Sequence, residues 1–400
     1  MTSPAGSYAQ RLLSSVGRPG HVDDATDPVA DWAGSGAMAL TGRQDGPPLV
    51  CTGPVIALRG ALLALSALGA TGLPGTELLA ERAALTGAGR RGDVSSGGAT
   101  RLLAARDGTV ALSLARDDDL ALLPALVEDE VTDPWTAVAA WARVRAVDEV
   151  RERGALLGLP LGVVGEVVAT TPWQVSHEHA GPRPDRPLVV DLTSLWAGPL
   201  CASLLTMLGC RVLKVEDPAR PDGARRGPPA FFDLLHAGAE LVELDLRSDR
   251  GRAELQELVR HADVVLEGSR PRALRQLGVV AEDVVSRHDL TWVSITAYGR
   301  EHDRVGFGDD AAAAGGLLAD GCFVADAVAD PLTGVHAALA AWAGIVTGGG
   351  RLVDVALSRV AATAAALSTG AGARVWQDGG WWVDTSQGPV PVAAPHGRRE

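Results

Sequence analysis

The sequence predicts an α/β protein in which helices cover both faces of a parallel sheet, with a smaller α+β domain beside it. Two patterns support this prediction. From residue 188 onward, short apolar runs alternate with amphipathic helical segments, as in parallel sheets that are covered on both faces. Between residues 96 and 114, a glycine pair precedes two apolar runs separated by an Asp-Gly turn signal, as in a β-hairpin. The length of 400 residues allows two or three domains with full cores.

The elements of the expected parallel sheet follow one another from residue 188. The predicted strands cover residues 188–192, 210–216, 240–246, 263–268 and 291–299, and the helices include residues 197–209 and 247–262. Ligands of such sheets bind outside the carboxyl ends of the strands. The loops expected there are residues 193–199, 216–223, 267–271 and 298–304. No GxGxxG or Walker sequence follows the first strand, so these loops alone do not define the ligand.

The rest of the chain is divided by composition. Residues 1–27 are polar and rich in Gly and Pro, and we expect a partly ordered N-terminal arm. A helical segment at residues 28–85 and a small domain at 86–180 follow; the small domain has further helical stretches near 118–127 and 135–157. A linker at residues 183–187 leads into the sheet domain of residues 188–365, and residues 366–400 form a C-terminal tail.

Charge and cysteine content narrow the class of protein. A net charge of −13 argues against a nucleic-acid binder, because phosphate backbones need a basic surface. The cysteines at positions 51, 201, 210 and 322 have neither CxxC nor zinc spacing, so we expect no metal site. The N-terminus lacks the apolar core of a signal peptide, and arginine and glycine interrupt the apolar runs. We therefore expect a cytoplasmic protein.

An internal repeat connects the two halves of the chain. Residues 53–68, GPVIALRGALLALSAL, echo residues 326–342, DAVADPLTGVHAALAAW, when Gly60 is aligned with Gly334. In this alignment, Ile56 stands where the second copy has Asp330. Locally, Asp330 is expected to be a helix N-cap with Pro331 at the first helical position. A carboxylate that only one copy keeps is also a candidate for chemistry.

Blocks of the second half resemble a known family. They are residues 189–216, VVDLTSLWAGPLCASLLTMLGCRVLKVE, then residues 240–278, 291–299, 329–341 and 348–358. Together they resemble the class III CoA-transferases, the CaiB/BaiF family, which includes formyl-CoA transferase, carnitine CoA-transferase and α-methylacyl-CoA racemase. The resemblance covers about residues 188–360. It implies a Rossmann-like sheet domain that binds CoA.

The first half resembles other parts of the same family. Residues 35–49, SGAMALTGRQDGPPL, resemble its middle. Residues 95–114 resemble its glycine loop and small domain, and residues 157–167 one of its late blocks. The resemblance therefore implies a permuted chain in which the middle segment occurs twice, at residues 28–85 and 305–350. For ordinary members it implies a homodimer of interlocked chains.

The resemblance also implies roles for individual residues. Asp330 matches the nucleophilic aspartate of the D-x-x-x-G pattern, and Gly97 and Gly98 match the loop that covers it. A carboxylate can attack an acyl-CoA thioester and form a mixed anhydride, which needs shelter from water. We expect an acyl-CoA and a carboxylic acid as substrates and no permanently bound cofactor. The positions implied for CoA are Trp196, Ala197, Leu244, Asp245, Leu246, Arg247, Gly268, Ser269, Arg270, Gln276, Phe307 and Gly308.

Two departures from the family pattern keep alternatives open. The family's Asn-x-Asn-Lys-Arg run is replaced by residues 236–240, HAGAE, which removes positive charge. The racemases have an acid/base histidine where this chain has Phe307, which argues against proton transfer at Cα. We favour an acyl-CoA:carboxylate CoA-transferase. The alternatives are a catalytically impaired CoA-binding protein of the same fold and another acyl-CoA enzyme of the isomerase or racemase type.

Overall fold

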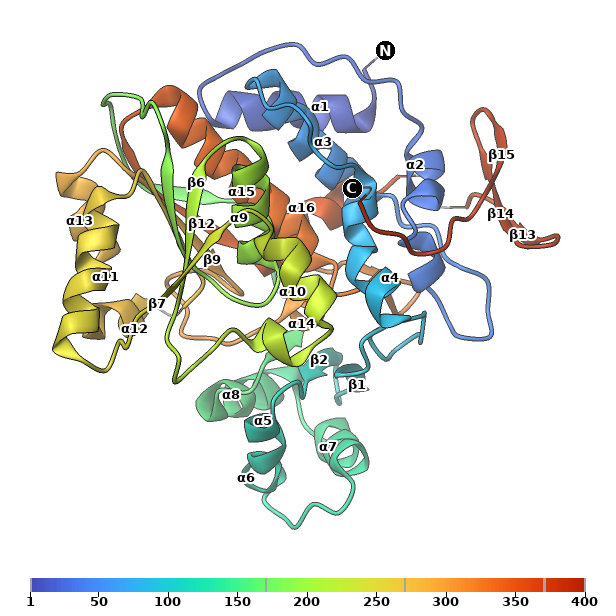
Figure 1. The fold of residues 1–400 in the computed structure, drawn as a ribbon. Coiled ribbons are helices and arrows are strands. Elements are labelled where there is room, and N and C mark those ends of the chain that lie inside the picture. Colours follow the sequence, from blue (N-terminus) through green and yellow to red (C-terminus); the bar gives the residue numbers. More distant parts are fainter. Residues whose placement is uncertain (1, 170, 270, 370–371, 399–400) are drawn as a thin grey trace.

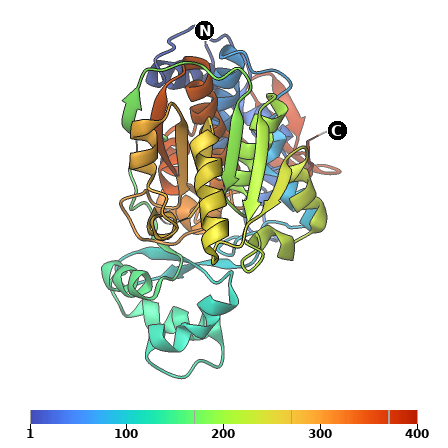
Figure 2. The same cartoon turned by 60° about the vertical axis from the view of Figure 1, so that its left-hand side comes forward.

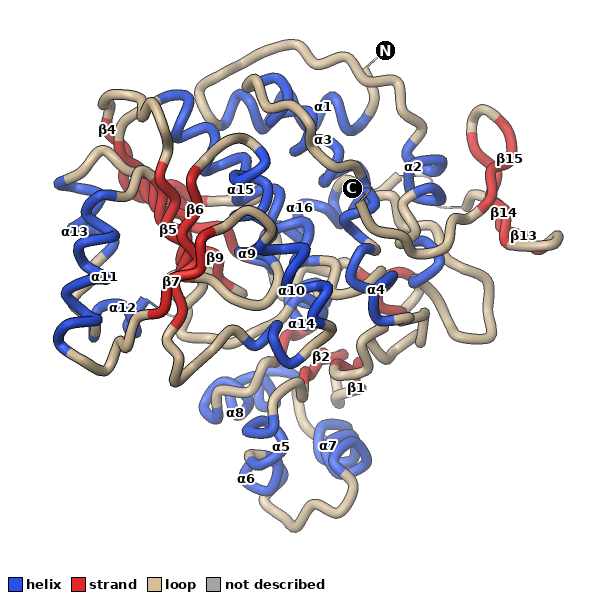
Figure 3. Tube along the Cα trace, in the orientation of Figure 1, coloured by secondary structure: helices blue, strands red, loops and turns tan. Residues whose placement is uncertain are grey.

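A seven-stranded sheet forms the centre of the protein in a computed structural model that describes residues 2–169, 171–269, 271–369 and 372–398 (Figure 1). Its order is β4 (Gln174–His179), β12 (Gly350–Ala356), β9 (Thr291–Thr296), β8 (Val264–Glu267), β5 (Leu188–Leu192), β6 (Arg211–Glu216) and β7 (Glu240–Glu243). All strands are parallel except β4, which runs antiparallel to β12. Figure 3 shows the strands of this sheet in red with helices around them. The predicted parallel sheet is confirmed.

Helices cover both faces of this sheet, as the sequence predicts. One face packs against α11 (Asp249–His261), α12 (Pro271–Gln276) and α13 (Ala281–Arg287), and the other against α9 (Ala197–Met207) and α15 (Ala329–Thr347). Successive strand residues take opposite sides: Val189 lies in the α9/α15 core and Val190 in the α11/α13 core. Because both sides of β5, β8 and β9 are largely buried, most residues of these strands are apolar.

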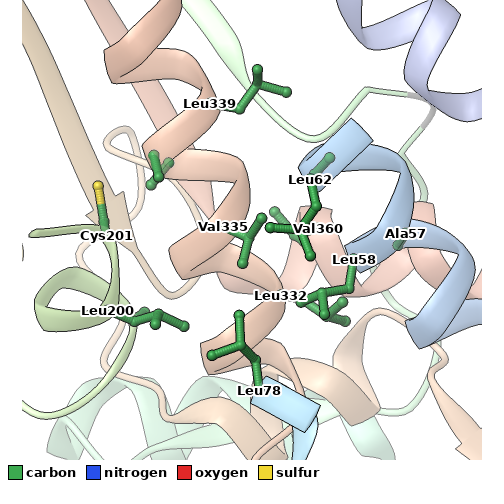
Figure 4. Packing of buried hydrophobic residues seen from close by; sticks show 14 of the residues in the cluster. Ala57, Leu58, Leu62, Leu78, Leu200, Cys201, Leu332, Val335, Leu339 and Val360 are labelled. Carbon is green, nitrogen blue, oxygen red and sulfur yellow. The ribbon is translucent and has the colours of Figure 1, made fainter. Parts of the chain in front are cut away.

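A third layer of helices lies beyond α15. Helices α3 (Gly53–Ala67) and α16 (Leu357–Ala366) pack on the side of α15 that faces away from the sheet (Figure 1). In Figure 4, Val335 of α15 lies among side chains of α3 and α16, including Leu62 and Val360. The sides of α15 that face α9, α3 and the sheet are therefore all buried, which explains why this helix carries almost no polar residues.

The N-terminal segment is not the arm that its composition suggested. Residues 4–15 form helix α1 (Pro4–Ser15), and Ser3 caps it by accepting a hydrogen bond from the Gly6 amide at 3.0 Å. The buried positions include Tyr8 and Leu12, four residues apart on one face, which overall composition conceals. The Tyr8 hydroxyl lies 2.8 Å from Nε2 of His336 in α15, which fixes α1 on the core.

The repeat seen in the sequence is also a repeat in space, and it includes α1. Helix α1 packs on α3 as α9 packs on α15. A Cβ added to Gly60 would lie 3.0 Å from the Ala5 carbonyl oxygen; one added to Gly334 would lie 2.8 Å from that of Ala197. Both glycines thus let one helix approach the first turn of another. The first copy lacks the sheet, because only residues 16–27 separate α1 from α2 (Pro28–Gly34), whereas β6 to β9 separate α9 from α14 (Gly308–Ala314).

The small domain lies below α14, apart from the main body (Figure 2). The predicted hairpin at Asp107-Gly108 is confirmed as β1 (Thr100–Ala104) and β2 (Thr109–Ser113), and β3 (Leu161–Val163) pairs with β2. The two predicted helical stretches are each divided into two helices: α5 (Asp117–Ala121), α6 (Leu123–Val127), α7 (Pro134–Arg143) and α8 (Val147–Leu157).

The C-terminal segment is more ordered than a tail. It forms an antiparallel sheet of β13 (Val375–Gln377), β14 (Trp381–Thr385) and β15 (Gly388–Pro391) beside α2 (Figure 1). Arg398 then forms a two-point ion pair with the buried Glu81 of α4 (Glu81–Thr86), with both N–O distances 2.8 Å. The end of the described chain is thereby fixed to α4.

The remaining elements are short. They are η1 (Met38–Leu40), η2 (Thr76–Leu79), η3 (Gly223–Arg226), α10 (Pro229–His236), β10 (Leu318–Ala319) and β11 (Cys322–Phe323). The four cysteines are buried and form no disulfide. Among the described residues, no helix is long and apolar enough to cross a membrane.

The repeated helix contact predicts the effect of adding one methyl group to each copy. Gly60→Ala and Gly334→Ala should each lower the free energy of unfolding by about 1–3 kcal/mol, because the packed neighbour must shift. Gly34→Ala is the matched control, since no heavy atom lies within 4 Å of its added Cβ. Urea unfolding measures all three variants. Equal stability of Gly60→Ala and Gly34→Ala would contradict a close α1–α3 contact.

Candidate active site

Asp330 occupies the second position of α15 and is not its N-cap. The helix begins at Ala329 after Val328, which makes no side-chain cap, and the Asp330 amide donates to the Ala327 carbonyl at 2.8 Å. The expected cap is wrong because the turn begins two residues earlier than the position of Pro331 suggested. Pro331 is tolerated in the first turn, where helical N–H groups lack partners. The carboxylate is therefore free for contacts outside its own helix.

Three chain segments meet at this carboxylate. Oδ2 of Asp330 lies so close to Gly308, at the start of α14, that a Cβ there would be 2.2 Å away. The backbone amide of Ala197, the first residue of α9, lies near the carboxylate and lowers its pKa. Asp330 itself remains partly exposed to solvent. The structure thus brings together three predicted site residues, Asp330, Ala197 and Gly308, at the carboxyl end of the sheet.

A strained turn sets the position of the Ala197 amide. Leu195 has a φ of 74°, which is unfavourable for a residue other than glycine. Its amide donates to Oδ1 of Asp222 at 2.9 Å, and Oδ2 of Asp222 lies 3.1 Å from the buried Lys214 ammonium. Lys214 also donates to the Thr193 carbonyl. This buried network holds the chain between β5 and α9 in the conformation that directs α9 toward Asp330.

Two acidic residues at the start of α14, Asp309 and Asp310, connect this helix to neighbouring segments by hydrogen bonds. Oδ1 of Asp309 accepts a hydrogen bond from the Ala327 amide at 3.1 Å. Asp310 accepts hydrogen bonds from Ser113 at 2.8 Å and Tyr298 at 3.0 Å, and so connects β2 of the small domain to the end of β9. Nothing in the local sequence marks these two acids as part of the site. Their structural partners are distant in the chain and carry no local signal.

Arg82 of α4 is a residue of the candidate site that the sequence did not predict. Its Nε lies 2.8 Å and its Nη2 2.5 Å from the two carboxylate oxygens of Asp326, and its guanidinium carbon lies 4.7 Å from the Trp196 ring centre. Nη2 is 3.8 Å from the Cβ position of Gly97. Nothing in the local sequence distinguishes Arg82 from the nearby Arg90 and Arg91. Only folding brings it to α15.

Asp326 also fixes the glycine loop. The Ser96 hydroxyl donates to Oδ1 of Asp326 at 3.0 Å, and it is 3.2 Å from the Ala325 carbonyl. Gly97 and Gly98 follow directly, and Gly98 has a φ of 82° that favours glycine. The predicted loop residues therefore lie beside Arg82 and the turn that precedes α15. Among the described residues, no hydrogen bond joins the peptide groups of Gly97 or Gly98 to Asp330.

The charges around Asp330 change its titration. Burial raises the pKa of Asp330 to about 7; Arg82 and the Ala197 amide oppose this rise, and Asp326 adds to it. Burial and the charge of Asp326 likewise raise the pKa of Asp309 to about 7, and burial raises the pKa of Asp310 to about 6. A carboxylate with a pKa near neutrality is more basic than an ordinary one and is still ionised above pH 7. Such a group is suited to attack an acyl carbon.

The other positions predicted for CoA are distributed along the carboxyl edge of the sheet. Trp196 is buried between Arg82 and Phe231. A Cβ added to Gly268 would lie 3.3 Å from Thr193, so Gly268 belongs to the α9 end of the site. Further along the edge are Leu244, Asp245, Leu246 and Arg247 after β7, Ser269 after β8, and Gln276 at the end of α12. Arg247 and Gln276 are exposed, and Arg270 lies outside the described residues.

The structure also shows the surroundings of the two positions at which the sequence departs from the family pattern. The ring of Phe307 lies 5.7 Å from the Arg116 guanidinium, and its amide donates to Asp310 at 2.8 Å. In the replaced basic run, His236 is buried, and Glu240 forms an ion pair with Arg211 at 2.8 Å. Residues 236–240 themselves therefore supply no lysine or arginine to this part of the edge.

Comparison with known proteins finds relatives of the second half of the chain. Residues 185–378 match the model of CoA-transferase family III. Succinyl-CoA--D-citramalate CoA-transferase of Chloroflexus aurantiacus is 30% identical over 201 residues, which are 44% of this chain and 50% of that protein. Succinyl-CoA:glutarate CoA-transferase of Mus musculus is 32% identical over 189 residues, 42% of this chain and 43% of that protein. This chain thus spans about half the length of the curated relatives it matches.

A solved structure is also similar in part. The crystal structure of a CaiB/BaiF family protein from Brucella suis has 25% sequence identity and a TM-score of 0.44 over 50% of this chain and 64% of that chain. The matched family segment contains Asp330, Ala197 and Gly308. Arg82 and the glycine loop lie outside it. The two sides of the candidate site therefore come from different halves of the sequence.

The raised pKa of Asp309 predicts a pH dependence of stability. Asp309 keeps its proton up to about pH 7 in the folded state but loses it near its usual pKa when unfolded. Its contribution to stability is therefore present at low pH and is lost as pH rises toward 7. The free energy of unfolding of Asp309→Asn minus that of wild type should therefore increase by about 1–3 kcal/mol from about pH 5 to about pH 8. Urea unfolding at both pH values measures this, and a constant difference would contradict the shift.

Proposed function

Residues 185–378 belong to CoA-transferase family III, and from this premise we propose that the chain is an acyl-CoA:carboxylate CoA-transferase with Asp330 as its nucleophile. The observation that carries the proposal is the setting of Asp330. It is partly exposed, its pKa is near 7, and it faces the first amide of α9. The glycine loop contacts Arg82 and is hydrogen-bonded through Ser96 to Asp326, in the turn that precedes α15.

The reaction would start at the carboxylate of Asp330. One carboxylate oxygen attacks the carbonyl carbon of the acyl-CoA thioester, the carbon–sulfur bond breaks, and CoA leaves as the thiolate. The product is a mixed anhydride between the acyl group and Asp330. The thiolate then attacks the Asp330 carbonyl carbon of this anhydride and releases the donor as its carboxylate. Asp330 now carries CoA as a thioester.

The acceptor acid would complete the exchange by the same steps in reverse. Its carboxylate attacks the carbonyl carbon of the Asp330 thioester and displaces the CoA thiolate. The thiolate then attacks the acceptor's acyl carbon in the new anhydride and frees Asp330 as the carboxylate. No net proton is taken up or released, so no general acid or base is required. This fits a site with Phe307 at the position where the related racemases have histidine.

The surroundings of Asp330 support two further needs of this chemistry. Oxyanions form at the attacked carbonyls, and the amides at the start of α9 and in the Gly97-Gly98 loop are the candidate donors for them. Anhydrides hydrolyse, so water must be kept away while one exists. The glycine loop, tied to Asp326 by Ser96, is the segment placed to exclude it. CoA is proposed to lie along the sheet edge from Ala197 and Gly268 toward Arg247.

A second candidate is a CoA-binding protein of the same fold without transferase activity. The replaced basic run favours it, because Glu240 and the buried His236 add no positive charge to the edge. The homodimer and the cytoplasmic location stay predictions. In this chain, α3 already covers the side of α15 that faces away from the sheet, so a second chain would have to dock elsewhere.

The proposed intermediates predict a covalent label on Asp330. After incubation with succinyl-CoA or acetyl-CoA, hydroxylamine or borohydride should trap a derivative of Asp330 that mass spectrometry of peptides detects. Asp330→Asn should give no label, whereas Asp309→Asn, at the neighbouring buried acid, should leave the label on Asp330. Binding of CoA without any label on Asp330 would favour the binding protein instead. Loss of both would remove both candidates.

The pKa of Asp330 predicts the pH dependence of the reaction. Because the protonated acid is not a nucleophile, kcat/KM should rise with pH through about 7 and level off above it. The rate of Asp330 labelling by acyl-CoA should follow the same curve. A profile that is flat from about pH 5.5 to about pH 8.5 would mean that a different group, or an ordinary carboxylate, limits the reaction.

A further inference from the structure

Arg82 offers one edge of its guanidinium group for a further ligand. Nε and Nη2 are engaged by Asp326, and Nη1 makes no hydrogen bond to any residue in the described ranges. The side chain is 29% exposed, and Nη1 is not fully buried. The Trp196 ring, 4.7 Å from the guanidinium carbon, supports its flat face. A guanidinium held in this way is pre-organised to bind a second carboxylate.

The charge of Arg82 acts directly on the proposed nucleophile. It lowers the pKa of Asp330 and of Asp309, and it is the cation with the largest effect on Asp330. Nη2 also lies 3.8 Å from the Cβ position of Gly97. Arg82 therefore stands near both the carboxylate that would carry CoA and the loop that would cover it.

The acidic surroundings create a need for this cation. Asp309, Asp310, Asp326 and Asp330 all lie around the start of α15, and a carboxylic acid substrate arrives as an anion. A second anion would be repelled unless a positive group compensates for it. Arg82 contacts this cluster through its ion pair with Asp326, which uses only part of its hydrogen-bonding capacity.

We propose that the free Nη1 edge of Arg82 binds the carboxylate of the acceptor acid, and of the departing donor acid, beside Asp330. This assignment rests on the proposed transferase function and adds to it the residue that selects carboxylates. Arg82 makes no covalent bond and transfers no proton in this role. It neutralises one oxygen of the acid while the other oxygen faces the carbonyl carbon of the Asp330 thioester.

Contacts with two distant parts of the chain fix the position of Arg82. Its neighbour Glu81 is completely buried and is held by Arg398, with both N–O distances 2.8 Å. On the other side, Asp326 holds the guanidinium itself. Arg82 lies outside the family-matched segment of residues 185–378. The N-terminal half thus supplies the acid-binding group, and the matched half supplies the nucleophile.

Half-reactions separate this proposal from the proposed function. The Asp330–CoA thioester is first formed with succinyl-CoA, and its decay is then followed against the concentration of added succinate or glutarate. Arg82→Gln should raise the acid concentration for half-maximal decay by about tenfold to a hundredfold, the value of one charge-assisted contact. The concentration of acyl-CoA for half-maximal labelling should change by less than about threefold. Arg82→Lys, which keeps the charge, should recover part of the acid dependence.

A second readout and a matched control exclude a merely structural role. In Arg82→Gln, the acid limb of the pH profile should move to higher pH, because the charge that lowers the pKa of Asp330 is lost. Arg91→Gln is the control: Nη1 of Arg91 lies 3.0 Å from the Cβ position of Gly98, but Arg91 is not among the charges that act on the pKa of Asp330. It should leave both the acid dependence and the pH limb unchanged.

Each outcome decides one of the two claims. If wild type forms no Asp330 thioester, the proposed function is wrong. If the thioester forms but Arg82→Gln consumes acid as wild type does, the assignment of Arg82 is wrong. Should Arg82→Gln fail to fold because Asp326 is left buried and unpaired, the double variant Arg82→Met/Asp326→Leu replaces the pair with apolar residues of similar size. The same rise in the half-maximal acid concentration is expected, and an unchanged value overturns the proposal.

Discussion

The close contact of α15 with the first turn of α9 is the constraint on which the candidate site depends. A single residue of α9, Ala197, meets α15 twice: its carbonyl oxygen packs against Gly334, and its amide faces the carboxylate of Asp330. Asp330 and Gly334 are one helical turn apart, so both point to the same side of α15. The D-x-x-x-G spacing thus has a physical reason. The glycine lets the helices approach, and the approach brings an amide to the aspartate.

The first copy of the helix pair separates the structural part of this arrangement from the chemical part. Gly60 packs on the Ala5 carbonyl as Gly334 packs on that of Ala197, so the close approach is retained in both copies. At the position of Asp330, however, the first copy has Ile56, which is buried in the core. A carboxylate is therefore not needed to form the helix pair. Its presence in the second copy, where α14 and the glycine loop also converge, points to a use beyond folding.

Sequence patterns predicted the parts of the fold that local chemistry determines. Buried parallel strands must be apolar on both sides, so β5, β8 and β9 are visible in the sequence. Strand β4, QVSHEH, is exposed along its length and gains its structure only from pairing with β12, so no pattern revealed it. Helix α1 was hidden because its buried face is averaged with polar neighbours. Asp330 could be found through its spacing to Gly334, but Arg82 could not, because its partner Asp326 is distant in the sequence.

The electrostatics of the site combine two opposing needs. A nucleophilic carboxylate reacts better when it is more basic, and burial of Asp330 beside Asp326 supplies this by raising its pKa. The same surroundings would protonate the group and repel an anionic acid if nothing opposed them. Arg82 and the Ala197 amide limit the rise to about 7. Asp309, whose pKa is also raised to about 7, is partly protonated at neutral pH and so contributes less than a full negative charge. In the proposed role, one arginine among four acids can admit a second carboxylate, because Asp309 and Asp330 are each partly protonated near neutral pH.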